Sequence, residues 1–484
     1  MACFIKVIQV FFVYSQNKIK FMPIARKLSI AEYSEMIMDS MGPIACIIGE
    51  SDMYQYNGSY YELLTTVEIG QIIYNYFLRE NIICMWTLSL EAGIIKAMRY
   101  HPTKIDNITE FDVNTRYINV TNGLIDLEST YPYDLVEHDP KIYYLTKVDV
   151  VYNPEINDSP NFMKFLNSSI TLPTMEPDTQ TIEFLMMMCG YIIYPQNPIE
   201  GIFVFLGGGA NGKSLFIDII KTFFPKEFLS TLSLRELSLD SMEKDQLLTS
   251  RLNICSEEQG KPIDSSQMKK IASGQDITLK RKFKNAMSIK PKCKVIVDSN
   301  TNPAFKDNTY GTMRRLNIIR WDNKAVEEEA YNKIKNPKES RIIKMIDRSI
   351  LLPSILEEKT AILNLFLFNL DKLKKRNWVL TVPDTAKKSL KKYKEQTDTF
   401  FSWVTENYEA DSDFTTPILT ILNDFRVYYS DHFPGQKFGF STRYVSNRIK
   451  EIFGIDGGRK NVSNGVGGRT TATIFNLKNK YDKY

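Results

Sequence analysis

The residues of this chain with the clearest capacity for chemistry are eight consecutive ones that follow the pattern G-x-x-x-x-G-K-[ST]: Gly207, Gly208, Gly209, Ala210, Asn211, Gly212, Lys213 and Ser214. Glycines let a backbone approach a bound group closely, and the backbone N–H groups at a helix start attract anions. In this pattern the lysine ammonium neutralises the β- and γ-phosphates of a nucleotide, and the hydroxyl binds Mg²⁺. The spacing therefore predicts that ATP and Mg²⁺ are bound, with Lys213 on the phosphates and Ser214 on the metal.

The flanking residues predict the elements that position this loop. Residues 202–206 are apolar and β-prone, and residues 215–220 form an apolar run that favours a buried helix. A strand, a glycine loop and a helix in this order distinguish a phosphate-binding loop from a chance glycine turn. We therefore expect a nucleotide-binding protein of the α/β class.

Two adjacent acids follow the next β-prone segment. Residues 251–255 are mostly apolar and end just before Glu257 and Glu258. One carboxylate in such a position can coordinate Mg²⁺, and the other can polarise the attacking water. The alternative is that both glutamates belong to an ordinary solvated surface.

Asn300 and an arginine pair complete the candidate catalytic residues. Asn300 ends the β-prone run 295–300, where its amide could orient a water molecule or the γ-phosphate. Arg314 and Arg315 follow it, and an arginine at the edge of an ATPase core can stabilise transition-state charge in a neighbouring subunit's site. The alternative for each arginine is a surface salt bridge.

Basic residues are concentrated in two regions. Residues 280–294 hold seven basic residues and no acidic one, and residues 437–484 hold ten basic residues against three acidic ones. Basic side chains bind the phosphate backbone of DNA, and an aromatic ring can pack on a sugar or a base. The candidate DNA-binding residues of the first region are Lys280, Arg281, Lys282, Phe283 and Lys284. The alternative is a solvated charged loop.

The order of these motifs resembles that of superfamily-three helicases, the ring-forming DNA-translocating ATPases of viruses, phages and plasmids. The similarity is greatest to the helicase part of the poxvirus primase-helicase and of phage and plasmid primases. Residues 270–276 resemble the K-x-x-T-G-x-D signature of that branch, with Ser273 in place of threonine. Residues 300–303 resemble its N-x-x-P, and residues 314–316 resemble its R-R-L.

The resemblance implies a P-loop core of the AAA+ type, with ATP bound between the subunits of a homo-oligomeric ring, a hexamer. The residue roles that it implies are Lys213 and Ser214 on ATP and Mg²⁺, Glu257 and Glu258 on metal and water, Asn300 as sensor, and Arg315 as arginine finger with Arg314 as the competing candidate. It also implies helicase activity on single-stranded and forked DNA in the 3′ to 5′ direction, with a separate primase or polymerase as a further partner. Only about fifty residues precede the region of resemblance, so we expect no primase activity.

The composition bounds these expectations. The chain has 484 residues, enough for about three domains, and 43% of them are hydrophobic. Six cysteines form no C-x-x-C pair and there are three histidines, so we expect no zinc site. Reduced thiols are typical of an intracellular protein, located in the host cytoplasm if it is viral. Residues 4–14 are too short to span a bilayer and lack the features of a signal peptide, so we expect no membrane partner.

The predicted division of the chain is as follows: 1–50, a leader without assignment; 51–195, an α+β domain in which residues 54–62 and 119–127 resemble the segment that precedes the ATPase in poxvirus-type primase-helicases; 196–322, the ATPase core; 323–384, a helical connector; and 385–484, a winged-helix DNA-binding module. The helices and the strand predicted outside the core lie at 67–79, 387–396, 400–408, 442–453 and 470–477, the last being the strand.

Two alternative functions come from other classes. One is a small-molecule kinase, which would work as a monomer without stimulation by DNA. The other is a DNA-binding ATPase scaffold or loader without unwinding activity. Both leave the basic run at 280–284 or the pair Arg314 and Arg315 without a task.

Overall fold

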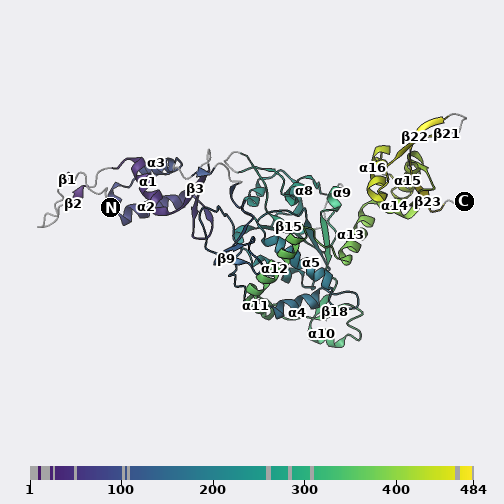
Figure 1. The fold of residues 1–484 in the computed structure, drawn as a ribbon, viewed down its shortest axis with the longest axis horizontal. Coiled ribbons are helices and arrows are strands. Elements are labelled where there is room, and N and C mark those ends of the chain that lie inside the picture. Colours follow the sequence, from purple (N-terminus) through teal and green to yellow (C-terminus); the bar gives the residue numbers. More distant parts are fainter. Residues whose placement is uncertain are drawn as a thin grey trace.

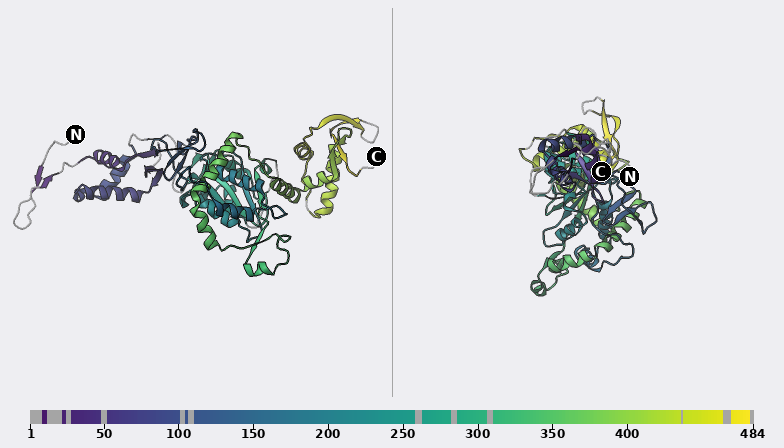
Figure 2. Two further views of the ribbon diagram at one scale, coloured as in Figure 1. Left: turned by 60° about the horizontal axis from the view of Figure 1, so that its bottom comes forward. Right: turned by 90° about the vertical axis from the view of Figure 1, so that its left-hand side faces the viewer.

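The computed structural model describes residues 9–11, 22–24, 28–47, 52–100, 104–105, 110–257, 263–281, 286–305, 310–435, 437–463 and 469–481. The molecule is elongated, with a small N-terminal part and a C-terminal module at opposite ends of a larger central part (Figure 1). The left view of Figure 2 shows the same arrangement after a 60° turn about the long axis, and the right view looks along that axis. Among the described helices, none combines the length and the apolarity that crossing a membrane requires.

The N-terminal part packs three helices against a small mixed sheet. Its helices are α1 (Ile30–Met41), α2 (Thr66–Arg79) and α3 (Leu88–Met98), with a 3₁₀ helix at Ile83–Met85. Its strands lie in the order β5 (Tyr61–Leu64), β4 (Met53–Tyr56), β3 (Ile44–Ile47) and β6 (Lys104–Ile105). Ahead of them, β1 (Gln9–Phe11) pairs antiparallel with β2 (Met22–Ile24).

Part of the predicted leader belongs to this N-terminal part. Ile37 of α1 and Ile44 of β3 share one buried cluster with Ile73 of α2. Helix α2 coincides with the predicted helix, and its start is fixed by a capping box in which Thr65 and Glu68 each accept the other's backbone N–H. The structure therefore differs from the predicted boundary at residue 50, which falls inside a packed unit.

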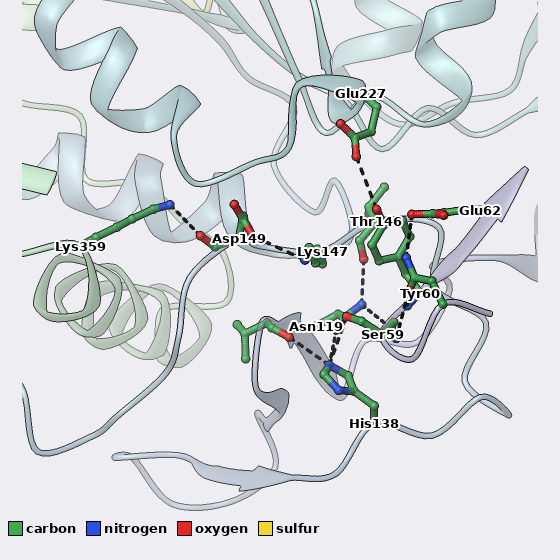
Figure 3. A network of polar contacts seen from close by, with 12 residues as sticks. Ser59, Tyr60, Glu62, Asn119, His138, Thr146, Lys147, Asp149, Glu227 and Lys359 are labelled. Carbon is green, nitrogen blue, oxygen red and sulfur yellow. Dashed lines mark hydrogen bonds and ion pairs between the residues drawn. The ribbon is translucent and has the colours of Figure 1, made fainter. Parts of the chain in front are cut away.

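An antiparallel sheet leads from the N-terminal part into the central one. It contains β7 (Tyr117–Val120), β8 (Gly123–Asp126) and β9 (Asp134–Val136), and helices α4 (Pro160–Ser169) and α5 (Thr179–Ile193) follow. His138 Nε2 lies 3.0 Å from both Asn119 Oδ1 and Val120 O, so this nitrogen donates. Asn119 Nδ2 donates in turn to the carbonyls of Ser59 and Thr146 (Figure 3). These bonds tie loops distant in sequence to one sheet.

Polar contacts join this sheet region to the rest of the central part. The Tyr60 hydroxyl donates to a carboxylate oxygen of Glu227 at 3.4 Å, and Lys359 Nζ donates to Asp149 O at 2.6 Å (Figure 3). One hydrophobic cluster also contains side chains from both sides of residue 195. The predicted domain boundary at residue 195 therefore does not separate two hydrophobic cores, because residues on both sides of it belong to one cluster.

A five-stranded, all-parallel sheet forms the centre of the molecule. Its order is β11 (Leu229–Ser230), β12 (Leu252–Glu257), β15 (Lys294–Ser299), β10 (Ile202–Leu206) and β16 (Leu316–Arg320). The strands are connected through α6 (Lys213–Lys221), α7 (Leu234–Ser238), α8 (Ser266–Ala272), α9 (Tyr310–Met313) and 3₁₀ helices at Lys226–Phe228 and Met242–Leu248. All of β10 is buried, as expected for a central parallel strand covered on both faces. The predicted α/β class is confirmed.

The segment between the sheet and the C-terminal module is only partly the predicted helical connector. Its elements are β17 (Lys324–Val326), α10 (Glu328–Lys333), β18 (Ile342–Lys344), α11 (Arg348–Glu357), α12 (Lys359–Lys375) and α13 (Asp384–Thr397). Strands β17 and β18 pair in parallel. Helix α13 packs on the central part, where the buried Tyr393 donates its hydroxyl hydrogen to Pro303 O at 2.7 Å. The predicted boundary at 385 therefore separates α13 from the surface on which it lies.

Three helices and five short strands make up the described part of the C-terminal module. Its elements are α14 (Thr399–Asn407), β19 (Tyr408–Ala410), β20 (Thr416–Pro417), α15 (Ile418–His432), α16 (Thr442–Phe453), β21 (Gly458–Ser463), β22 (Arg469–Phe475) and β23 (Leu477–Asn479). Three strands form a sheet in the order β20-β22-β21, and β19 pairs with β23. Phe400, Phe425 and Val445 bring the three helices into one buried cluster. Helices α13, α14 and α16 and strand β22 overlap the elements predicted at these positions.

Candidate functional site

The glycine loop lies at the carboxyl end of β10, between that strand and α6. Gly209 and Gly212 have φ values of +97° and +90°, in the region that glycine adopts most readily. At Gly207 the constraint is space, because an added Cβ would lie 2.1 Å from Asn211 Nδ2 and 2.4 Å from Trp321 O. The glycines are therefore needed both for the path of the backbone and for its close packing.

Hydrogen bonds fix the loop to the chain that follows β16. Asn211 Nδ2 donates to Trp321 O at 3.0 Å, and Asn211 Oδ1 accepts from Lys213 N at 3.3 Å. Ala325 N of β17 donates to Ala210 O at 2.6 Å. The position of the loop thus depends on the neighbouring strand β17 as well as on β10.

Lys213 begins α6 and is 4% exposed. Its Nζ contacts four oxygen atoms: Gly207 O at 2.8 Å, Ser299 O at 2.9 Å, Asn300 Oδ1 at 3.1 Å and Asp298 Oδ1 at 3.1 Å. An ammonium has three hydrogens to donate, so these acceptors saturate it. The predicted residues Lys213 and Asn300 are therefore in direct contact, and Asp298 joins them.

The parallel register brings three strand ends to one edge of the sheet. Leu206 of β10 is level with Ser299 of β15, which is level with Glu257 of β12. Adjacent strands lie about 4.8 Å apart, so the Glu257 backbone is roughly 10 Å from the strand that carries the loop. The side chain of Glu257 and the whole of Glu258 lie outside the described residues.

A cavity of about 450 Å³ opens beside the loop. That volume is within the range of small-molecule sites, roughly 300–1,000 Å³. The residues that line it are Phe165, Ser168, Ser169, 209–215, Asp298, Asn300, Ala325, 343–346, Arg348 and Leu351. One wall is the loop with the end of β15, and the other comes from β17, β18 and α11. Ser214, in the first turn of α6, is exposed to this cavity.

The second wall and Asp298 are parts of the site that sequence reasoning missed. Residues 342–346 read Ile-Ile-Lys-Met-Ile, a β-prone run that could have indicated a strand inside the predicted connector. Asp298 directly follows the apolar residues 295–297 and lies two residues before Asn300, so its position near the end of a β-prone run could have indicated a site residue. Among the described residues, no group of three or more His, Cys, Asp or Glu side chains is arranged to hold a metal ion.

The arginine pair lies at the opposite edge of the sheet. Ile202 N, at the start of β10, donates to Arg315 O at 2.7 Å, whereas the glycine loop follows the end of the same strand. The Arg315 guanidinium is buried: Nε and Nη2 donate to Ser273 Oγ at 3.1 and 2.9 Å, and Nη2 lies 2.7 Å from Glu200 Oε2. Burial lowers the pKa of Arg315, and Glu200 opposes this. Arg314 also pairs with Glu200, at 2.5 Å, and remains exposed.

The basic run joins two antiparallel strands, β13 (Ile277–Leu279) and β14 (Met287–Ile289). Lys280 Nζ lies 2.6 Å from Asp240 Oδ2 in an exposed ion pair. Arg281 differs from its predicted role, because it is buried and its Nη2 lies 2.6 Å from Asp52 Oδ2 in the N-terminal part. In this structure Arg281 is not presented to DNA. Lys282, Phe283 and Lys284 lie outside the described residues.

The fold and the site together define an α/β protein with a glycine loop and an adjoining cavity at the carboxyl edge of a parallel sheet. Two family models match this chain. Residues 205–315 match a family described as "Family of unknown function (DUF5906)", and residues 89–170 match a family described as "D5 N terminal like". The first match contains the glycine loop, Asn300 and the arginine pair.

Viral proteins are among the relatives. The chain is 26% identical over 258 residues to "Putative helicase L207/L206" of Acanthamoeba polyphaga mimivirus, covering 51% of this chain and 26% of that protein. It is 23% identical over 333 residues to "Putative primase C962R" of African swine fever virus, covering 66% of this chain and 33% of that protein. The chain thus spans about a quarter to a third of the length of these relatives. The predicted resemblance to viral helicase and primase proteins is confirmed.

Among solved structures, the apo C-terminal region of NrS-1 aligns with a TM-score of 0.49 at 11% sequence identity. The alignment covers 93% of this chain and 100% of that one.

Proposed function

We propose that this chain is an ATP-driven DNA helicase of the superfamily-three type that acts in viral DNA replication. The observation that carries the proposal is the position of Lys213. It lies beneath a glycine loop, at the carboxyl edge of a parallel sheet and beside a cavity of about 450 Å³. The names of the viral relatives support a replication role for this chain.

The strand order supports an AAA+-like P-loop core. The loop strand β10 lies between β16 and β15, Asn300 follows the end of β15, and β12 with Glu257 is the next strand beyond β15. The glycine loop, Asn300 and Glu257 thus follow strand ends at one edge of the sheet, and this supports assigning them the phosphate-binding, sensor and acid roles that ATP hydrolysis requires.

In the proposed reaction, Lys213 and the loop N–H groups bind the β- and γ-phosphates, and Asn300 orients the attacking water. Ser214 and Glu257 would hold Mg²⁺, which supplies charge neutralisation when bound. Glu258 is proposed to polarise the water. Because Lys213 now contacts four oxygens, phosphate binding exchanges some of these contacts for contacts to the nucleotide.

The arginine pair is proposed to act in the site of a neighbouring subunit, in a hexameric ring. A strand of five residues, β10, separates Arg315 from the glycine loop of its own chain, and such a strand is roughly 15 Å long. That length exceeds the reach of one arginine side chain, so action in the same chain's site is disfavoured. Arg315 is anchored by Ser273, whereas Arg314 is exposed. We therefore propose that one arginine of the pair acts in the site of the neighbouring subunit, and a rescue experiment decides whether it is Arg314 or Arg315.

The hairpin β13–β14 is proposed to carry single-stranded DNA through the ring, using Lys280, Lys282, Phe283 and Lys284. In sequence the basic run follows β13 and precedes β14, and its charge suits a phosphate backbone. Forked DNA and a separate primase or polymerase are proposed partners.

One experiment tests the proposed function: the ATP hydrolysis rate with and without single-stranded DNA, together with the particle mass in solution. We expect stimulation by DNA and a mass near that of six chains. A monomer without stimulation would indicate a small-molecule kinase, and DNA binding without unwinding of a forked substrate would indicate a scaffold or loader. Because some relatives are named primase, template-directed primer synthesis by this chain is measured in parallel, and our prediction is that there is none.

A further inference from the structure

Helix α16 presents two chemically different faces. Val445 and Ile449 are buried in the core of the C-terminal module. On the opposite face Arg443, Asn447 and Lys450 are exposed, and their spacing of four and three residues places them in one stripe along the helix. These three side chains thus form a basic and polar stripe over residues 443–450 of this 12-residue helix.

Two arginines on this helix have different surroundings. Arg448, at the flank, is 11% exposed and pairs with Asp398 and Glu451, so it holds the module together. Among the described residues, no acidic partner faces Arg443. Lys450 lies 2.5 Å from Asp456, but both side chains are largely exposed, and such a pair contributes little and is screened by salt. The stripe therefore keeps positive charge that the module itself does not use.

The hairpin that follows adds charge of the same sign. Residues 457–481 contain five basic residues and no acidic one. Arg459 and Lys460 of β21 are both exposed, and because side chains alternate along a strand they point to opposite faces of the hairpin. One of them can therefore face the same ligand as α16. The module lies at one end of the molecule, away from the central sheet, so this surface is separate from the glycine loop (Figure 1).

The aromatic residues indicate which nucleic acid this surface suits. Proteins that bind single strands stack bases on exposed aromatic rings. Here Phe400, Trp403 and Phe425 are buried, and burial raises the pKa of Tyr444, the aromatic residue in the first turn of α16, to about 12. The exposed stripe carries no aromatic ring. A helix is about 10–12 Å wide with its side chains, which matches the major groove of B-DNA, about 12 Å wide.

We propose that the C-terminal module, residues 399–481, binds duplex DNA with α16 in the major groove. Arg443 and Asn447 face base edges, where arginine and asparagine side chains can each form paired hydrogen bonds. Lys450 and one of the two residues Arg459 and Lys460 of β21 contact phosphates. Helix α15 packs on α16 from behind, as the first helix of a helix-turn-helix does. This function does not depend on ATP, and it goes beyond the unwinding proposed for the central part.

The test is binding of the full chain to a fluorescent 20-base-pair duplex without nucleotide, compared with a single strand of the same length. The variant Arg443→Ala/Asn447→Ala/Lys450→Ala should bind the duplex at least about tenfold more weakly. Its affinity for the single strand should change less than about twofold. The matched control is Lys388→Ala/Lys392→Ala. It also removes two positive charges, but from exposed positions on α13, outside the proposed interface. It should bind the duplex like the unmodified chain.

Each other outcome would overturn the proposal. Unchanged duplex affinity in the triple variant would remove α16 from the interface, and an equal loss on the single strand would indicate a single-strand site. An equal loss of duplex affinity in the control variant would mean that the effect comes from the lower net charge of the chain and not from α16. Equal binding of duplex RNA would exclude a helix in the major groove, which is too narrow in A-form RNA. Should the triple variant unfold, Arg443→Glu alone gives the same comparison. Since duplex binding is measured without ATP, failure of the helicase proposal would leave this result intact.

Discussion

Lys213 Nζ lies 3.1 Å from Asp298 Oδ1, so the candidate phosphate-binding lysine forms an ion pair with an acid from the neighbouring strand. The two residues are 85 positions apart in sequence, and the parallel pairing of β10 with β15 brings them together. The carboxylate occupies a position on the lysine that an anionic phosphate would otherwise take. Asp298 therefore competes with the proposed ligand.

Neutralising this acid should strengthen nucleotide binding. In Asp298→Asn, a phosphate no longer has to displace a carboxylate from Lys213, so the affinity for ATP should rise by about fivefold, corresponding to roughly 1 kcal/mol for a partly exposed pair. Calorimetric titration with a non-hydrolysable ATP analogue measures this. The control is Asp322→Asn, which removes a carboxylate that pairs with the exposed Arg320 and should leave the affinity unchanged. Weaker binding in Asp298→Asn would instead assign this acid to the bound metal or water.

Removing the lysine should abolish hydrolysis and also affect stability. Lys213→Ala takes away the charge that faces the phosphates, and it removes the lysine donor from Asp298 and from the carbonyls of Gly207 and Ser299. We expect no measurable phosphate release and a free energy of unfolding lower by about 1–3 kcal/mol. The double variant Lys213→Ala/Asp298→Asn should recover part of that stability but no activity. Near-normal turnover in Lys213→Ala would contradict the ATPase assignment.

Local patterns in the sequence were sufficient to predict the loop and many elements. The apolar run at 202–206, the glycines and the apolar run at 215–220 predict β10, the loop and α6, because each depends on residues adjacent in sequence. The same holds for α2 and α16, where the start or end is marked by a cap such as Thr65 or Gly454. Asn300 was predicted from its place at a strand end, and the structure puts it 3.1 Å from Lys213 Nζ.

What could not be predicted depends on contacts between distant segments. The role of Asp298 requires the register between β10 and β15, and the second wall of the cavity requires residues 343–346 to fold back over the loop. Arg281 is the clearest case. Its neighbours in sequence are basic, as in a DNA-binding segment, but Arg281 itself is buried and forms an ion pair with Asp52, 229 residues earlier. A run of basic residues in the sequence does not reveal which of them forms an ion pair with a distant acid.

The loop glycines allow a matched pair of substitutions. At Gly207 an added Cβ would collide with Asn211 Nδ2 and Trp321 O, whereas at Gly208 no atom lies within 4 Å of an added Cβ. Gly207→Ala should therefore lower the unfolding free energy by about 1–3 kcal/mol, as overpacking does, and Gly208→Ala should change it by less than about 0.5 kcal/mol. Chemical denaturation followed by intrinsic fluorescence measures both. Equal stability of the two variants would mean that the loop does not pack against the chain after β16 in solution.

The basic run should separate into two classes of residue. Lys280→Ala/Lys282→Ala/Lys284→Ala should weaken single-stranded DNA binding and reduce the slope of log affinity against log salt by about 2, since each phosphate contact contributes roughly 0.7. Arg281→Ala should instead destabilise the chain by about 3–5 kcal/mol, because it leaves Asp52 buried without this partner. Anisotropy titrations at several salt concentrations and thermal unfolding distinguish the two effects. An unchanged salt slope in the lysine variant would indicate that these lysines do not contact DNA phosphates and belong to an ordinary solvated loop.

The arginine pair provides the test of a ring. If an arginine completes the next subunit's site, its alanine variant should bind ATP normally and hydrolyse it about a thousandfold more slowly. Co-expression of Arg315→Ala with Lys213→Ala should then restore part of the activity, because an intact Lys213 in one subunit meets an intact Arg315 from its neighbour. The same experiment with Arg314→Ala decides between the buried and the exposed member of the pair.

The control for this rescue uses a chain that carries both changes. Lys213→Ala/Arg315→Ala mixed with Lys213→Ala has no intact lysine in any subunit, so no rearrangement of the ring can restore hydrolysis. A monomer, or an arginine that acts in its own chain's site, also gives no rescue. The latter case conflicts with the placement of Arg315 at the opposite edge of the sheet from the glycine loop. Absence of rescue in rings shown by mass to be mixed would remove the trans-acting role from the variant arginine, and rescue with only one of the two variants would identify the finger.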